Sequence, residues 1–306
     1  MRDVSSKQPT LRIASATAIL RVAKQTLKRI HDQTVPKGDP LPVARVAAIQ
    51  AAKQTSNIIP YCHPIPIEWA SCEFELDDKI GEIRIHTQVK AVHKTGVEME
   101  ALTAAGAAAL TLYDVLKPID DGMEIASIRL TKKEGGKSDF RITDLPIRAA
   151  VVVISDSVSQ GKREDRSGIL IKQRLREENV GEVIDKVVSD DPKAIESVLR
   201  ELSDSGAVDI VLTTGGTGLG PRDNTPEVTK ALIERELPGI SETLRSYGQE
   251  RTPFSMLSRG MAGVRGTTLI VNLPGSPKGV QEGLDVLFPA VKHALKMMRG
   301  EGHPTR

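Results

Sequence analysis

Apolar residues in the first half of the chain follow both strand-like and helix-like patterns. Apolar and polar positions alternate in two runs separated by Asp77-Asp78-Lys79, as in a β-hairpin. The whole pattern predicts helices over 43–55 and 97–116 and strands over 70–76, 80–89 and 125–130. Strands and helices mixed in this way favour an α+β domain of the ferredoxin-like type, with helices covering one face of an antiparallel sheet.

The second half contains short, almost wholly apolar runs, each followed by a loop of small or polar residues. The runs Ala149–Ile154, Val208–Leu212 and Thr267–Val271 are typical of strands that are buried on both faces. A helical pattern then extends from Gly279 to Met298. We therefore expect a three-layer α/β domain with a mostly parallel sheet.

The length of 306 residues suits two domains of about 150 residues each. The apolar pattern is interrupted between Thr131 and Arg148 by a segment rich in lysine and glycine. We therefore assign residues 1–140 and 147–306 to separate domains, joined by a linker over 141–146. The halves share neither motifs nor element order, so we expect a fusion rather than a repeat.

Composition excludes several classes of protein. Hydrophobic residues make up 39% of the chain, charged residues 27%, and the net charge is +2, as in a globular protein with no marked affinity for nucleic acid or membranes. Aromatic residues are only 3%, too few for a base-stacking surface. We find no signal peptide and expect a cytoplasmic protein. Cys62 and Cys72 stand alone, which argues against structural zinc or a disulfide framework.

A glycine-rich loop over residues 213–226 follows the second apolar run of the second half and precedes a helix. Glycines let a backbone approach a phosphate closely, although such a loop alone is more often a tight turn. Asp223 strengthens the functional interpretation, because a carboxylate beside phosphate is unfavourable unless it holds a cation such as Mg²⁺. Residues 272–278 and Ser155-Asp156-Ser157 follow the other two runs, so all three loops should face one crevice.

Together these loops resemble those of the molybdopterin adenylyltransferase family, over residues 147 to 299. The resemblance implies that ATP and molybdopterin are the substrates, that Mg²⁺ is the cofactor, and that no organic cofactor is tightly bound. It places the two metal-linked catalytic acids at Asp223 and Asp190, with Asp191 as the alternative to the latter. It implies that the substrates contact Ser155, Asp156, Gly215, Gly216, Thr217, Gly218, Pro274, Gly275 and Ser276.

Polar residues of the first half have ordinary explanations when they are taken singly. Glu98 and Glu100 begin a predicted helix, where the helix dipole favours acids. Asp114 and Lys117 are three residues apart near its end and could form a surface pair. As a set they are more specific, since residues 1 to about 140 resemble cyclic pyranopterin monophosphate synthase in the segments 37–39, 62–64, 94–103, 113–114 and 135–138.

That resemblance implies a lyase that converts 3′,8-cyclo-7,8-dihydroguanosine triphosphate into cyclic pyranopterin monophosphate, with loss of pyrophosphate. It places catalysis on Asp114, Lys37 and Lys117. A lysine desolvated beside another cation would have a pKa low enough for proton transfer. The implied substrate-binding residues are Tyr61, Cys62, His63, Glu98, Met99, Glu100 and Lys137, and Tyr61 replaces the leucine that is usual in this family.

Helix geometry adds a prediction about assembly. Glu100 and Asp114 are fourteen residues apart, so one continuous helix separates them by about 21 Å. If both serve one substrate, the site is built from two subunits. The two resemblances imply a homo-oligomer with threefold symmetry, a trimer or a hexamer. The alternative function is that only the first half is catalytic and the second half is a molybdopterin carrier or scaffold.

Overall fold

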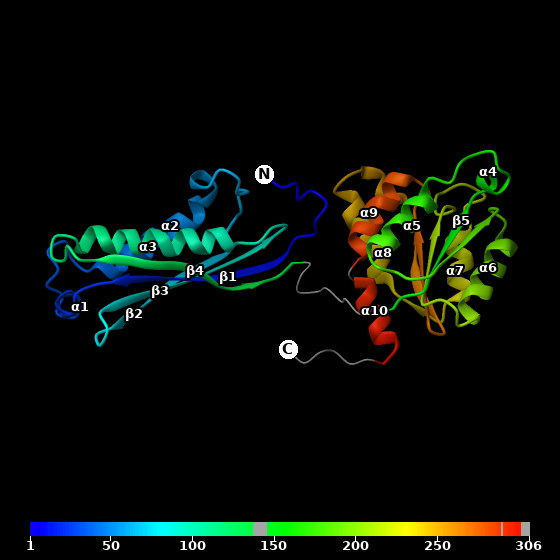
Figure 1. The fold of residues 1–306 in the computed structure, drawn as a ribbon. Coiled ribbons are helices and arrows are strands. Elements are labelled where there is room, and N and C mark those ends of the chain that lie inside the picture. The colour runs from blue at the N-terminus through cyan, green and yellow to red at the C-terminus, as the bar shows by residue number, and fades with distance from the viewer. Residues whose placement is uncertain (137–145, 289, 301–306) are drawn as a thin grey trace. The chain divides into compact units, whose positions relative to one another are not determined.

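The computed structural model describes residues 1–136, 146–288 and 290–300 (Figure 1). The chain forms two compact units, Met1–Phe140 and Arg141–Arg306. Lys137 and residues 141–145 of the expected linker lie outside the described residues.

The first unit is a four-stranded antiparallel sheet with the strand order β2-β3-β1-β4. Helices α2 and α3 cover one face of it (Figure 1). The prediction of an α+β domain with helices on an antiparallel sheet is therefore confirmed. Its elements are β1 (Thr10–Arg21), α1 (Lys24–His31), α2 (Pro40–Ile58), β2 (Trp69–Asp77), β3 (Glu82–His93), α3 (Glu98–Leu116) and β4 (Glu124–Glu134).

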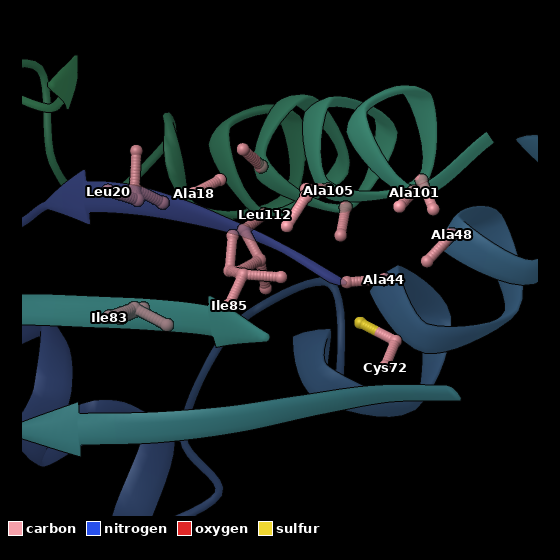
Figure 2. Packing of buried hydrophobic residues seen from close by; sticks show 14 of the residues in the cluster. Ala18, Leu20, Ala44, Ala48, Cys72, Ile83, Ile85, Ala101, Ala105 and Leu112 are labelled. Atoms are coloured by element: carbon pink, nitrogen blue, oxygen red, sulfur yellow. The ribbon is translucent and has the colours of Figure 1, made fainter. Parts of the chain in front are cut away.

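Strand β1 lies in the middle of this sheet, between β3 and β4, and was not predicted from the sequence. Ala14, Ala16 and Ala18 point from it into the core, and alanine is depleted in strands, so the local signal for a strand was weak. Small side chains also line the facing helix, where Ala101 and Ala105 are buried (Figure 2). Small residues on both sides allow α3 to lie close to the sheet.

Among the described helices, α3 alone is long and apolar enough to cross a membrane by length and composition. Half of its apolar window is buried inside the unit. Leu112 is fully buried and lies near Ile85 of β3 (Figure 2). This burial identifies α3 as the core helix of the first unit.

The second unit has a six-stranded sheet with the order β6-β5-β7-β10-β9-β8. Strands β6, β5, β7 and β10 are parallel, β9 pairs antiparallel with β10, and β8 pairs antiparallel with β9, which confirms the mostly parallel sheet. Its strands are β5 (Ala149–Ile154), β6 (Val183–Val188), β7 (Ile210–Thr214), β8 (Arg235–Glu236), β9 (Ala262–Arg265) and β10 (Thr268–Leu273). Its helices are α4 (Asp156–Ser159), α5 (Ser167–Glu177), α6 (Pro192–Asp204), α7 (Thr225–Leu232), α8 (Pro238–Gln249), η1 (Pro253–Leu257), α9 (Pro277–Leu287) and α10 (Ala290–Met298).

Strand β5 is buried on both faces, as its unbroken apolar run predicts. Val151 belongs to a core shared with Leu175 of α5 and Leu284 of α9. Val152, the next residue, belongs to a different core shared with Leu199 of α6. Alternate residues of one strand thus serve two cores, and the sheet is the middle of three layers.

The single helix predicted over 279–298 is wrong, because the structure has two helices, α9 and α10, in its place. Phe288 ends α9 with an extended backbone, φ −94° and ψ 134°. The next residue in the sequence is a proline, which disfavours helical conformation in the residue before it. The apolar periodicity continues across this break, and the prediction of a single helix rested on that periodicity alone.

Candidate active sites

Asp114, Lys37 and Lys117 lie together at the carboxyl end of α3. The Lys37 ammonium donates to the Asp114 backbone oxygen at 2.9 Å and to its Oδ2 at 3.2 Å. The Lys117 Nζ is 2.7 Å from Asp114 Oδ1. All three side chains are roughly half exposed. The structure therefore brings together the three residues that the sequence suggested for catalysis.

The charges in this cluster stabilise one another in their ionised forms. Hydrogen bonds from Lys117, and then from Lys37, lower the pKa of Asp114. The hydrogen bond to Asp114 in turn raises the pKa of Lys117. A low lysine pKa, expected from the sequence, is therefore wrong for Lys117 in the single chain, because its neighbour is a carboxylate and it remains in water.

Glu100 occupies the opposite end of α3, in its first turn, and is only 3% exposed. Its Oε2 is buried without a hydrogen-bond partner. Burial raises the pKa of Glu100 to about 7. Burial also raises the pKa of Cys62, and the Glu100 charge raises it further, which shows that the two residues are neighbours. A carboxyl with a pKa near neutrality is suited to donate or accept a proton.

Other sequence-predicted residues surround this end of α3. The Glu98 carboxylate is 3.9 Å from Lys133 Nζ, and Met99 is exposed. The Tyr61 side chain is 79% exposed. Lys137 falls outside the described residues.

Two residues beside this cluster were not identified from the sequence, His93 and Arg12. Burial lowers the pKa of His93, and the charge of His63 lowers it further. The Arg12 guanidinium donates to the His93 backbone oxygen at 3.0 Å. Both residues lie in strands whose pairing brings them together, and no local motif marks them.

Glu100→Gln should make folding stability less dependent on pH. Because the pKa of Glu100 is raised in the folded chain, this carboxyl keeps its proton above pH 4.5, where the unfolded chain releases it. Stability should therefore fall as pH rises from about 4.5 to about 7. The variant should be more stable by roughly 1–3 kcal/mol at about pH 8, and by much less at about pH 5, in urea unfolding.

Glu98→Gln is the matched control, since it removes an equivalent charge two residues away from a side chain that is 35% exposed. An equal gain for Glu100→Gln at both pH values would show that the buried charge is not the cause.

In the second unit, three loops meet at the carboxyl ends of β5, β7 and β10. They enclose a cavity of about 430 Å³. Because these strands are parallel, their carboxyl ends share one edge of the sheet, as the sequence led us to expect. The sequence-predicted residues that line the cavity are Ser155, Asp190, Gly215, Gly216, Gly275 and Ser276.

Hydrogen bonds hold the glycine loop in place. The Thr214 hydroxyl donates to the Pro274 backbone oxygen at 2.7 Å, which joins the loops after β7 and β10. The Thr225 hydroxyl donates to the Gly215 backbone oxygen at 2.9 Å. Gly215 has φ +105°, and a Cβ there would overlap the backbone oxygen of Ile154. Glycine is thus required at this position by both conformation and space.

Gly215→Ala should destabilise the second unit by about 3 kcal/mol or more, since positive φ and steric overlap add. Gly161→Ala is the matched control, because Gly161 also has positive φ, +69°, but open space around the position of a Cβ. It should cost only about 1 kcal/mol. Chemical denaturation of both variants measures the difference, and equal losses would contradict the predicted overlap.

The structure distinguishes Asp190 from Asp191. The Asp191 carboxylate accepts a hydrogen bond from the Ala194 amide at 3.0 Å and caps α6. Asp190 lines the cavity, and its Oδ2 accepts from the Asp156 amide at 2.8 Å. Asp156 Oδ1 accepts from the Asp190 amide at 3.1 Å in return. Asp191 is therefore engaged in the helix cap, and Asp190 is the acid available to a ligand.

Asp223 holds the turn of its own loop, where its Oδ2 accepts from the Gly220 amide at 2.7 Å. Arg259 supports the same loop by donating from Nε to the Gly218 oxygen at 2.7 Å and from its amide to the Thr217 oxygen at 3.1 Å. The walls of the cavity do not include Asp223, Thr217, Gly218, Asp156 or Pro274. Five of the sequence-predicted residues are therefore in the surrounding loops rather than in the wall.

The carboxylates near the cavity are candidate ligands for Mg²⁺. Within residues 1–136, 146–288 and 290–300, no three His, Cys, Asp or Glu side chains cluster as a complete metal site. Magnesium bound with a nucleotide commonly takes one or two carboxylates, with phosphates and water completing its shell. Asp190, at the cavity wall, is placed for that partial role, whereas Asp223 lies outside the wall and its Oδ2 accepts from the Gly220 amide.

The segment from Arg163 to Ser167 also lines the cavity and was missed. The Ser167 hydroxyl donates to the Gly275 oxygen at 2.9 Å, and Asp165 accepts from the Gly168 amide at 2.7 Å. The available signal was a charged run directly before an amphipathic helix. Arg163 and Arg166 bring positive charge to the cavity, and Glu164 and Asp165 of the same segment bring negative charge.

The second unit is an α/β domain with glycine-rich loops at the carboxyl ends of parallel strands, an arrangement that often binds phosphates, and it follows an α+β domain with two polar clusters. Residues 1–136 match the MoaC family, and residues 150–293 match the probable molybdopterin binding domain. A molybdenum cofactor biosynthesis bifunctional protein from Chlorobaculum tepidum is 41% identical over 304 residues, 99% of this chain and 96% of that protein. The chain belongs to this family of bifunctional proteins.

Further relatives cover the whole chain or one half of it. A bifunctional protein of the same description from Synechococcus elongatus is 38% identical over 317 residues, 100% of this chain and 99% of that protein. Cyclic pyranopterin monophosphate synthase from Clostridium perfringens is 53% identical over 138 residues, 45% of this chain and 87% of that protein. The crystal structure of the molybdopterin biosynthesis enzyme MoaB from Thermus thermophilus is 43% identical, with a TM-score of 0.48, and covers 52% of this chain and 99% of that one.

Proposed function

We propose that the first unit is a lyase that converts the cyclised GTP derivative into cyclic pyranopterin monophosphate and pyrophosphate. The observation that carries this proposal is the cluster of Lys37 and Lys117 around Asp114. Two lysines can hold the triphosphate, and Glu100 supplies a proton-transfer group whose pKa is near neutrality. The proposal predicts pyrophosphate release from that substrate by the purified chain, measured with a phosphate-coupled assay.

The same unit acts as a homo-oligomer in this proposal. The cluster at Asp114 and the cluster at Glu100 lie at opposite ends of one helix, about 21 Å apart along its axis. One subunit therefore supplies Asp114 to a shared site and a neighbour supplies Glu100. A trimer and a hexamer both have a threefold axis, so either assembly has the symmetry expected for both units.

We also propose that the first unit has the ferredoxin-like fold. Its elements follow the order β-α-β-β-α-β once α1 and α2 are counted as one connection. The strand order β2-β3-β1-β4 supports this classification.

For the second unit we propose a nucleotidyltransferase that adenylylates molybdopterin, with ATP as the second substrate. The observation that supports it is the cavity of about 430 Å³ where three loops meet beside Asp190. Asp190 and Asp223 would hold Mg²⁺, which supplies charge neutralisation for phosphates. The backbone amides of the glycine loop and the arginines of 163–166 would orient the nucleotide. Small molecules are the expected partners, in the cytoplasm, with no nucleic acid or membrane.

A second candidate function is a molybdopterin carrier or scaffold, with catalysis confined to the first unit. It is favoured by the position of Asp223, which lies outside the cavity wall. Calorimetric titration with ATP, with Mg²⁺ and then with EDTA, distinguishes the two candidates. Binding that requires Mg²⁺ supports the transferase, and binding of molybdopterin with no binding of ATP would support the carrier.

A further inference from the structure

An ion pair joins two of the loops around the cavity of the second unit. The Nη2 atom of Arg222 is 3.0 Å from Asp156 Oδ1 and 2.8 Å from Oδ2. Arg222 precedes Asp223 in the glycine loop, and Asp156 follows β5. The guanidinium thus connects the loop that carries Asp223 with the loop after β5.

Asp156 is also bound directly to Asp190. Each residue donates its amide to the carboxylate of the other, at 2.8 and 3.1 Å. The two carboxylates are therefore neighbours, and Arg222 places a positive charge on one of them. A cation beside a pair of acids opposes the binding of a second cation there.

The ion pair is open to solvent, since the Arg222 side chain is 63% exposed and that of Asp156 is 34% exposed. Phosphate oxygens are preferred partners of a guanidinium and compete with a carboxylate for it. Asp156 and Arg222 lie outside the cavity wall, but Ser155, the residue before Asp156, and Asp190, its hydrogen-bond partner, line the cavity. Phosphates of a nucleotide bound there would therefore compete with Asp156 for Arg222. An exposed ion pair adds little to folding stability, so stabilisation of the fold does not account for the pairing of Arg222 with Asp156.

We propose that Arg222 is a positioning residue whose guanidinium neutralises the acidic pair Asp156 and Asp190 until nucleotide phosphates bind the guanidinium in place of Asp156, so that a divalent cation enters only together with the nucleotide. This inference rests on the proposed transferase function and adds an order of binding to it. The residue acts through Asp156 and touches no reacting atom.

The test measures binding of Mn²⁺ alone, as a paramagnetic substitute for Mg²⁺, to the full chain by electron paramagnetic resonance. Arg222→Gln should bind Mn²⁺ roughly 5- to 30-fold more tightly than wild type, because the competing charge is gone. Arg200→Gln is the matched control, since it removes the same charge from a half-exposed ion pair, with Glu196 at 2.8 Å, that lies outside the cavity wall. It should change Mn²⁺ affinity by less than about twofold.

A double-mutant cycle isolates the ion pair. In an Asp156→Asn background, Arg222→Gln should have almost no further effect on Mn²⁺ affinity. An equal gain in Arg200→Gln and Arg222→Gln, or no gain in either, would overturn the proposal. The same samples are then titrated with ATP in the presence of Mg²⁺. If the wild type does not bind ATP under these conditions, the result counts against the transferase function. The ratio of Mn²⁺ affinities between the variants separately tests the role of Arg222.

Discussion

Asp223→Ala should lower the rate of formation of adenylylated molybdopterin by about 10²- to 10³-fold, the loss typical of one group that stabilises developing charge. Asp190→Ala should have an effect of similar size. Both carboxylates are the proposed support for Mg²⁺, and Asp190 lies in the cavity wall. The measurement is product formation by the purified chain with molybdopterin, ATP and Mg²⁺.

Asp191→Ala is the matched control for Asp190→Ala. It removes the same carboxylate one residue further along, where the side chain caps α6. It should reduce stability by about 1 kcal/mol and leave turnover close to that of wild type. If the wild-type chain binds both substrates and forms no product, the second unit is a carrier, and the first unit is the only enzyme of the pair.

Mixed oligomers of Asp114→Ala and Glu100→Ala chains should regain lyase activity that neither variant has alone. Each variant lacks one half of the shared site, and the two halves lie at opposite ends of α3. In a random mixture, one subunit supplies Asp114 and its neighbour supplies Glu100 in up to about a quarter of the sites. Activity of coexpressed chains, measured as pyrophosphate release, checks this.

Two comparisons control for the mixed-oligomer experiment. Each variant coexpressed with a tagged copy of itself should stay inactive. Lys117→Ala mixed with Asp114→Ala should also stay inactive, because both residues belong to one cluster in one chain. Recovery in that second mixture, or no recovery with Glu100→Ala, would show that the site is not divided between subunits in this way.

Periodicity located the elements with a clear local pattern, but not strand β1 at the centre of the first sheet, and not β6, β9, α5, α6 or α8 of the second unit. Helix α3 and strands β2, β3, β5 and β10 follow from their own residues, because each has a clear local pattern. Strand β1 depends on pairing with β3 and β4, and its core positions are alanines with little strand preference of their own. Motifs likewise located the loops around the cavity, while Arg163, Arg166 and Ser167 reach it only through folding.

The sequence by itself determined the division into two kinds of domain, the phosphate-type loops after buried strands, and the separation of Glu100 from Asp114, because all of these depend on local spacing. Tertiary structure decided which groups meet. Lys37 reaches Asp114 across 77 residues, and Asp190 rather than Asp191 faces the cavity, since the latter caps a helix. Burial of Glu100, and with it a pKa near 7, also arises only when the helix packs on the sheet, because desolvation is a property of the folded surroundings.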